Sequence, residues 1–150
     1  NPVKPPNRKS CYNFRVTEVV KVIDGDTIDV VIDLGFDLYK KERVRIAGVD
    51  TPEKRTRDAE EKALGIDATV WMQTQLQEAL DSDSDLIIRT ELEGGFGKYG
   101  RLLGWLYVGD ANVSLNEQMI EDGYAWSYDG GTKKKNFDEL RQIRESKGTL

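Results

Sequence analysis

Four acidic residues stand in two short motifs, each at a point where a run of β-forming residues gives way to a turn. Asp24 and Asp26 lie in IDGDT, and Asp50 and Glu53 lie in VDTPE. If three of these carboxylates converged within about 5 Å, each pair would repel by about 3 kcal/mol at an effective dielectric constant of about 20. The repulsion summed over the three pairs rivals the stability of a whole domain, about 5–15 kcal/mol. Convergence would therefore require a cation, and oxygen ligands alone select calcium or magnesium.

Each acidic motif also has a purely structural interpretation. Asp-Gly is a common hairpin turn, and DTPE fits an aspartate cap followed by a proline that enters a helical turn. Taken singly, either motif is more often structural than catalytic.

Two arginines extend the acidic set toward phosphate chemistry. Arg45 precedes Asp50 on one β-forming run, and Arg101 closes the glycine-rich segment GKYGR, which also carries Lys98 and Tyr99. A guanidinium group can hold two phosphate oxygens through its planar fork. Phosphodiester hydrolysis can be carried out by a hard metal, a carboxylate that orients or deprotonates water, and two guanidinium groups that hold the phosphate.

The spacing of Arg45 and Asp50 leaves their relative placement open. Side chains at odd separation point to opposite faces of a strand. Arg45 therefore points with Val49 rather than with Asp50, unless a bulge intervenes near Gly48.

The composition excludes several other chemistries. The 150 residues include no histidine and one cysteine, Cys11, which excludes Ser-His-Asp, Cys-His and H-E-x-x-H sites and any disulfide within the chain. With 27 acidic against 22 basic residues, the formal charge of −5 argues against binding nucleic acid by bulk positive charge. No apolar run suits a membrane span or a signal peptide. We expect a monomer without a membrane partner, and leave the compartment, secreted or cytoplasmic, open.

The elements that must position these residues follow from the hydrophobic pattern. Residues 1–13 hold three prolines and predict an irregular arm, which leaves 14–150 as one domain. Asp24-Gly25 predicts a hairpin in which glycine supplies a positive φ. The helix predicted over 58–80 has its strongest pattern from residue 67 onward, because Gly65 lowers the helix propensity of its first half. Strands are predicted over 14–23, 27–34, 38–49, 86–92 and 102–108, and helices over 58–80, 114–122 and 137–147.

The predicted order βββ-α-ββ-α-α is that of an α+β fold, a five-stranded OB-fold β-barrel with three helices. In the shorter helix, Ser114 is the expected N-cap, with Glu117 completing a capping box and Gly123 ending the helix. Gly148 ends the last helix. Fold alone does not give function, so the function must be argued from the side chains.

The segments VIDGDT, VRIAGVDTPE and GKYGRLLGWLY, in this order and near this spacing, resemble the staphylococcal nuclease family from Val16 to the C-terminus. The resemblance implies an OB-fold nuclease that needs calcium and cleaves DNA and RNA with little sequence preference, leaving 3′-phosphate ends. It also implies roles for individual residues: calcium carboxylates Asp26 and Asp50, the backbone carbonyl of Thr51, general base Glu53, phosphate-binding Arg45 and Arg101, and substrate-binding Lys98, Tyr99 and Tyr128.

The chain departs from the family at a few places. It has Gly97 where the best-known member has an acid, and its loop between the second and third strands is longer. Trp126 and Tyr128 align loosely, as base-stacking residues or as core aromatics. The run Lys133–Lys135 is either a solvated loop or a contact for the phosphate backbone.

Two alternatives come from other functional classes. One is a catalytically silent nuclease-like module that binds nucleic acid or a protein, although such modules typically lose the acids and arginines that this chain keeps. The other is an OB-type binding domain without metal, which would need a basic, aromatic-rich groove.

Overall fold

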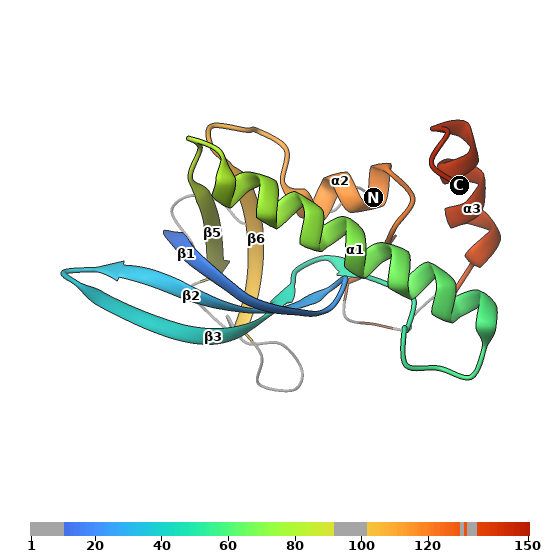
Figure 1. Cartoon of the computed structure of the whole chain (residues 1–150), viewed down its shortest axis with the longest axis horizontal. Helices are drawn as coiled ribbons and strands as arrows, with labels where there is room; N and C mark the ends of the chain where they lie inside the picture. Colours follow the sequence, from blue (N-terminus) through green and yellow to red (C-terminus); the bar gives the residue numbers. More distant parts are fainter. Residues whose placement is uncertain (1–10, 92–101, 130, 132–134) are drawn as a thin grey trace.

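The computed structural model describes residues 11–91, 102–129, 131 and 135–150. Among these residues, five strands close into a barrel with the order β1-β2-β3-β6-β5 (Figure 1). Their bounds are β1 Cys11–Asp24, β2 Thr27–Gly35, β3 Leu38–Ile46, β5 Leu86–Glu91 and β6 Leu102–Val108. A separate two-stranded sheet pairs β4, Val49–Asp50, with β7, Trp126–Ser127. The helices are α1 Ala59–Asp81, α2 Leu115–Glu121 and α3 Phe137–Ser146.

This arrangement confirms the predicted α+β fold, a five-stranded barrel with three helices. The residues predicted to cap α2 and to end α2 and α3 are also confirmed. Ser114 and Glu117 form the capping box of α2, and Gly123 and Gly148 take positive φ just past α2 and α3. No helix in the described part of the chain combines the length and apolar character needed to cross a membrane.

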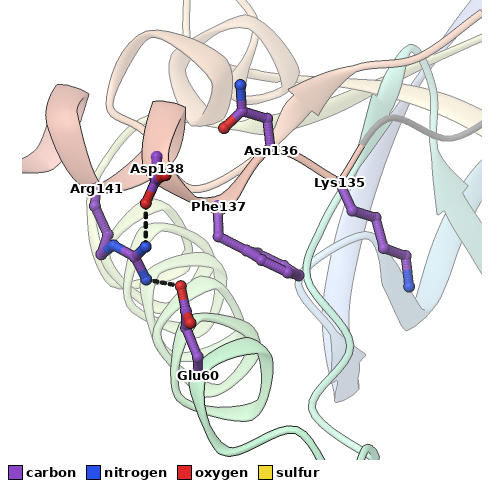
Figure 2. A pocket seen from close by; sticks show the side chains of 6 residues that line it. All are labelled: Glu60, Lys135, Asn136, Phe137, Asp138 and Arg141. Atoms are coloured by element: carbon purple, nitrogen blue, oxygen red, sulfur yellow. Dashed lines mark hydrogen bonds and ion pairs between the residues drawn. The ribbon is translucent and has the colours of Figure 1, made fainter.

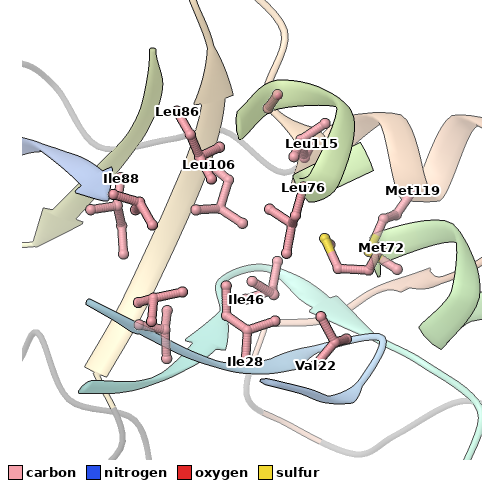
Figure 3. Packing of buried hydrophobic residues seen from close by; sticks show 14 of the residues in the cluster. Val22, Ile28, Ile46, Met72, Leu76, Leu86, Ile88, Leu106, Leu115 and Met119 are labelled. Carbon is pink, nitrogen blue, oxygen red and sulfur yellow. The ribbon is translucent and has the colours of Figure 1, made fainter. Parts of the chain in front are cut away.

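The hydrophobic core lies between the barrel interior and one face of α1. Alternate residues of β2 (Ile28, Val30 and Ile32) are buried, as the period of two requires. Met72 and Leu76 of α1 are at most 1% exposed and face the barrel (Figure 3). Fully burying a side chain of this size contributes about 1.5–3 kcal/mol, so this face of α1 fixes the helix on the barrel.

Strand β1 begins earlier than predicted. Cys11–Asn13, which we assigned to an irregular arm, pair with Glu91–Arg89 of β5. Their hydrogen-bonding partner lies far along the chain, so no local pattern reveals it.

The third strand ends earlier than predicted, at Ile46 rather than at residue 49. Gly48, with φ of 76°, turns the chain there and separates β3 from the short strand β4. Only glycine adopts this conformation without strain.

The connection between β2 and β3 is a tight turn at Phe36 and Asp37, both with positive φ. The longer loop expected between these strands is therefore not formed, because β2 and β3 continue up to the turn and project together from the barrel (Figure 1).

The hairpin at Asp24-Gly25 is confirmed, but the reason given for its glycine is wrong. Gly25 does not have a positive φ. A Cβ atom at Gly25 would lie 2.9 Å from Cβ of Ala68 and 3.0 Å from Cγ2 of Thr51. Glycine is therefore required because the hairpin packs directly on α1 and on the second acidic motif.

Gly65 has a similar place on α1. The helix begins at Ala59 with Asp58 as its N-cap and continues through Gly65 without interruption. A Cβ atom there would lie 2.7 Å from backbone atoms of Pro52, Glu53 and Lys54. The glycine that weakens the helix on propensity alone is the point at which the VDTPE turn rests on it.

Replacing Gly65 with alanine tests this contact. Alanine in a helix interior ordinarily stabilises by about 1 kcal/mol relative to glycine. Because the new methyl group would meet backbone rather than a flexible side chain, we expect Gly65→Ala to lower the free energy of unfolding by about 1–3 kcal/mol. Urea unfolding measures it. Ala63→Gly, at an exposed position of the same helix, calibrates propensity, and a stabilised Gly65→Ala protein would contradict the close contact.

Candidate active site

Asp26 joins the two acidic motifs. It lies in the turn between β1 and β2, is 9% exposed, and its Oδ1 accepts a hydrogen bond from the Thr27 hydroxyl at 3.1 Å. Its Oδ2 accepts from the backbone N–H of Thr51 at 3.2 Å. Its own carbonyl accepts from the N–H of Ile46 at 2.8 Å. The structure therefore brings IDGDT and VDTPE together although 25 residues separate Asp26 from Thr51.

Arg45 lies between the two buried carboxylates. Its guanidinium group, on β3, is 3.4 Å from Oδ2 of Asp26 and 3.8 Å from Oδ1 of Asp50. It also donates to the carbonyl of Ile46 at 3.0 Å. The turn at Gly48 is what brings Arg45 and Asp50 together: the strand ends before Gly48, so neither a continuous strand nor a bulge within one describes this segment.

Asp50 and Thr51 are held in place by the small sheet. Asp50 pairs with Trp126 across β4 and β7, and the N–H of Tyr128 donates to the carbonyl of Gly48 at 2.9 Å. Asp50 is 3% exposed and Thr51 is 4% exposed. The second acidic motif is thus anchored by a segment about 75 residues further along the chain.

Asp24 is a third acid beside this pair, and it is absent from the roles that the resemblance implies. Burial and then the charge of Asp26 raise the pKa of Asp24, while Lys54, Arg55 and Arg45 act weakly in the opposite direction. Its Oδ1 is buried and has no hydrogen-bond partner. The signal for Asp24 was present in the IDGDT motif, where two acids flank one glycine.

Glu53 lies at the edge of this cluster. Its side chain is exposed, whereas Thr51 and Pro52 before it are buried. Its backbone N–H donates to Oε2 of Glu61 at 3.1 Å. Glu61 belongs to α1 and to no motif singled out in the sequence.

The remaining predicted site residues divide into two groups. Lys98, Tyr99 and Arg101 lie outside the described residues, and so do Lys133 and Lys134. Tyr128 is half-buried next to the Gly48 turn, and its substrate-binding role stays a prediction.

Trp126 is a core aromatic rather than an open stacking surface. It is 6% exposed, and its indole N–H donates to the carbonyl of Asn136 at 3.0 Å. Its ring also packs 5.7 Å from that of Phe137.

The donor set suits a hard cation. Asp24, Asp26 and Asp50 carry three negative charges in a partly buried region where Arg45 supplies one positive charge, and every donor is an oxygen atom. Within the described part of the chain, no group of three or more acidic or cysteine side chains is close enough to hold a metal by itself. A cation here would therefore bind through two carboxylates, backbone and water.

Comparison with known proteins matches the same region. The model of the family described as staphylococcal nuclease homologue matches residues 43–148. The chain is 30% identical over 138 residues to protein ParB of Escherichia coli, covering 87% of this chain and 67% of that protein. It is 31% identical over 121 residues to a micrococcal nuclease of Shigella flexneri, covering 74% and 57% respectively. It is 29% identical over 114 residues to a thermonuclease of Staphylococcus hyicus, covering 75% and 59%. The nuclease names of two of these relatives support a nuclease function.

The raised pKa of Asp24 predicts the sign of a stability change. The folded state binds a proton at Asp24 more tightly than the unfolded state does, so the charged carboxylate lowers stability once the pH exceeds the unfolded value of about 3.9. Asp24→Asn should therefore raise the free energy of unfolding at pH 7 in the presence of a chelator. The difference from wild type should vanish below a pH of about 3.9.

Asp33→Asn provides a control of opposite sign. A hydrogen bond from the Gly35 N–H, together with Arg15, lowers the pKa of Asp33, so its charge stabilises the fold at neutral pH. That variant should be less stable at pH 7. A destabilised Asp24→Asn protein would mean that favourable contacts outweigh the burial of this carboxylate.

Proposed function

The chain belongs to the staphylococcal nuclease homologue family, and from that premise we propose that it is a calcium-dependent nuclease. It would hydrolyse phosphodiester bonds in DNA, RNA or both with little sequence preference and leave 3′-phosphate ends. The observation that carries this proposal is the position of the Arg45 guanidinium group within 4 Å of carboxylate oxygens from both acidic motifs. That grouping needs residues from β1–β2, β3 and β4, which are distant in sequence.

Asp26 and Asp50 would hold the cation through their carboxylates and Thr51 through its backbone carbonyl. When bound, the cation would offset the excess negative charge and polarise a phosphate oxygen. The buried oxygen of Asp24 adds further negative potential beside these ligands.

The protein side chains supply the rest of the proposed chemistry. Glu53 would accept a proton from the water that attacks phosphorus, while the bond to the 5′-oxygen breaks and that oxygen takes up a proton. Arg45 would donate from its planar fork to phosphate oxygens that gain negative charge during the attack. Arg101 is the proposed second fork.

Metal dependence tests the proposal directly. We expect plasmid DNA or RNA to be degraded with calcium, more slowly with magnesium and not at all with a chelator. A site built from two carboxylates, a carbonyl and water suits the loose coordination of calcium better than the strict octahedron of magnesium. Turnover that is equal or faster with magnesium would contradict the calcium assignment. Binding of nucleic acid without cleavage under every condition would indicate the silent module.

Arg45→Lys tests the proposed role of the guanidinium fork. Lysine keeps the charge but loses the bidentate geometry, so we expect kcat to fall by on the order of 10² while the fold is retained. Arg43→Lys is the matched control. Arg43 lies two residues earlier on β3, is exposed, and donates to both carboxylate oxygens of the half-buried Asp29, at 2.9 and 3.2 Å. Equal kcat values for the two variants, measured with thermal melts as a check of folding, would remove Arg45 from the mechanism.

A further inference from the structure

Glu61 is a buried carboxylate that the motifs do not explain. It lies in the first turn of α1 and is 6% exposed. Its Oε2 accepts two hydrogen bonds, from the backbone N–H of Glu53 at 3.1 Å and from Nζ of Lys135 at 3.2 Å. One oxygen atom thus connects α1, the VDTPE turn and the segment before α3.

Capping of the helix does not account for this burial. Asp58 is the N-cap and accepts from the N–H groups of Glu60 and Glu61. Any acid in the first turn gains from the helix dipole, and Glu60 does so while exposed. Burying a carboxylate costs free energy unless charged or hydrogen-bonding partners offset it. For Glu61 those partners are Lys135 and the backbone of Glu53.

The helix contacts the same turn at a second point. Residues four apart lie on the same face of a helix, which places Gly65 directly beside Glu61. Gly65 meets the backbone from Pro52 to Lys54 with no room for a methyl group. The turn that carries Glu53 is therefore held to α1 by a hydrogen bond at one position and by close packing one helical turn further on.

The neighbouring acid Glu60 makes no such contact with the VDTPE turn and serves as a comparison for Glu61. Figure 2 shows Glu60 paired with Arg141 of α3, which also pairs with Asp138. Lys135 lies on the other side of Phe137 in this view, in the segment that leads into α3. Adjacent acids thus make separate contacts, one between two helices and one to the candidate site.

We propose that Glu61 is a positioning residue for Glu53, with Lys135 as the cation that keeps its carboxylate in place. The inference rests on the proposed function, in which Glu53 accepts a proton from water. One charge-assisted hydrogen bond fixes the backbone of Glu53 to the Glu61 carboxylate, and a second, from Lys135, holds that carboxylate in place. The backbone in turn sets where the exposed carboxylate of Glu53 can reach. Misplacing a catalytic group by about 1 Å can cost on the order of 10² in rate.

The test compares Glu61→Ala with Glu60→Ala in a cleavage assay with calcium. We expect Glu61→Ala to lower kcat by on the order of 10- to 100-fold with little change in KM. Glu61→Gln keeps an oxygen that can accept from the Glu53 N–H, so it should recover part of the loss. Glu60→Ala should cleave at the wild-type rate. A wild-type kcat for Glu61→Ala would overturn the proposal.

A double-mutant cycle shows whether Glu61 acts through Glu53. If it does, Glu61→Ala should cause no further loss of kcat in a Glu53→Gln protein, because effects within one unit do not add. Fully additive losses would overturn the proposal. Should Glu61→Ala fail to fold, Glu61→Gln and Lys135→Met replace it, and wild-type kcat in both would overturn the proposal.

Hydrogen exchange at the Glu53 backbone amide separates this inference from the proposed function, because it requires no activity. We expect that amide to be protected in the wild type and to exchange faster in Glu61→Ala, with Glu60→Ala unchanged. Wild-type protein without cleavage would remove the nuclease proposal and with it the catalytic meaning of Glu61, while the exchange result would still report the contact. An unprotected Glu53 amide in active wild-type protein would overturn the positioning role alone.

Discussion

The burial of like charges is the constraint on which the rest of this structure depends. Asp26 and Asp50 are both less than a tenth exposed, and each would be costly to bury alone. Their cost is reduced by the Arg45 guanidinium group between them and by the Thr51 N–H and Thr27 hydroxyl on Asp26. These compensating groups come from β2, β3 and the VDTPE turn, so the burial of the acids depends on the folded barrel.

The compensation is incomplete, and this incompleteness has chemical consequences. One arginine faces three acids, and the pKa of Asp24 is raised by its burial and by Asp26. A fully neutralised cluster would have little affinity for a cation or for a water molecule that must lose a proton. The residual negative potential would favour the binding of a hard cation between the motifs. The apolar packing between the barrel and α1 is what allows the fold to tolerate this potential.

The sequence predicted most strands and helices well, because the interactions that specify them join residues close together in the chain. Strand alternation in β2, the capping box at Ser114 and the terminal glycines at positions 123 and 148 each act within a few residues. The errors arise where a distant partner decides. Cys11–Asn13 form a strand because β5 lies beside them, and helix propensity at Gly65 cannot register the backbone of Glu53 packed against it.

The same limit applied to the candidate site. Motif spacing identified Asp26, Arg45, Asp50, Thr51 and Glu53, and the structure places the first four in contact with one another or with a shared partner. The alternation of side chains along a strand could not predict the contact between Arg45 and Asp50, because that contact depends on the φ of Gly48. Glu61 and its contact with Lys135 could not be found, since 74 residues separate the two and the sequence assigned Lys135 only to a solvated loop or a phosphate contact.

The C-terminal third of the chain completes a site whose acids all lie in the first half. β7 pairs with β4 and so fixes Asp50, and Lys135 contacts Glu61 behind the VDTPE turn. Helix α3 is in turn held to α1 by the ion pair of Arg144 with Asp67 at 2.7 Å. The Arg144 guanidinium group also lies 4.5 Å from the ring centroid of Tyr124, just past α2. A chain folded only as far as the barrel would hold the acidic motifs without these supports. The acidic motifs are thus supported from the C-terminal part of the chain at two places, at β4 by its pairing with β7 and at the VDTPE turn by Glu61, whose carboxylate Lys135 contacts.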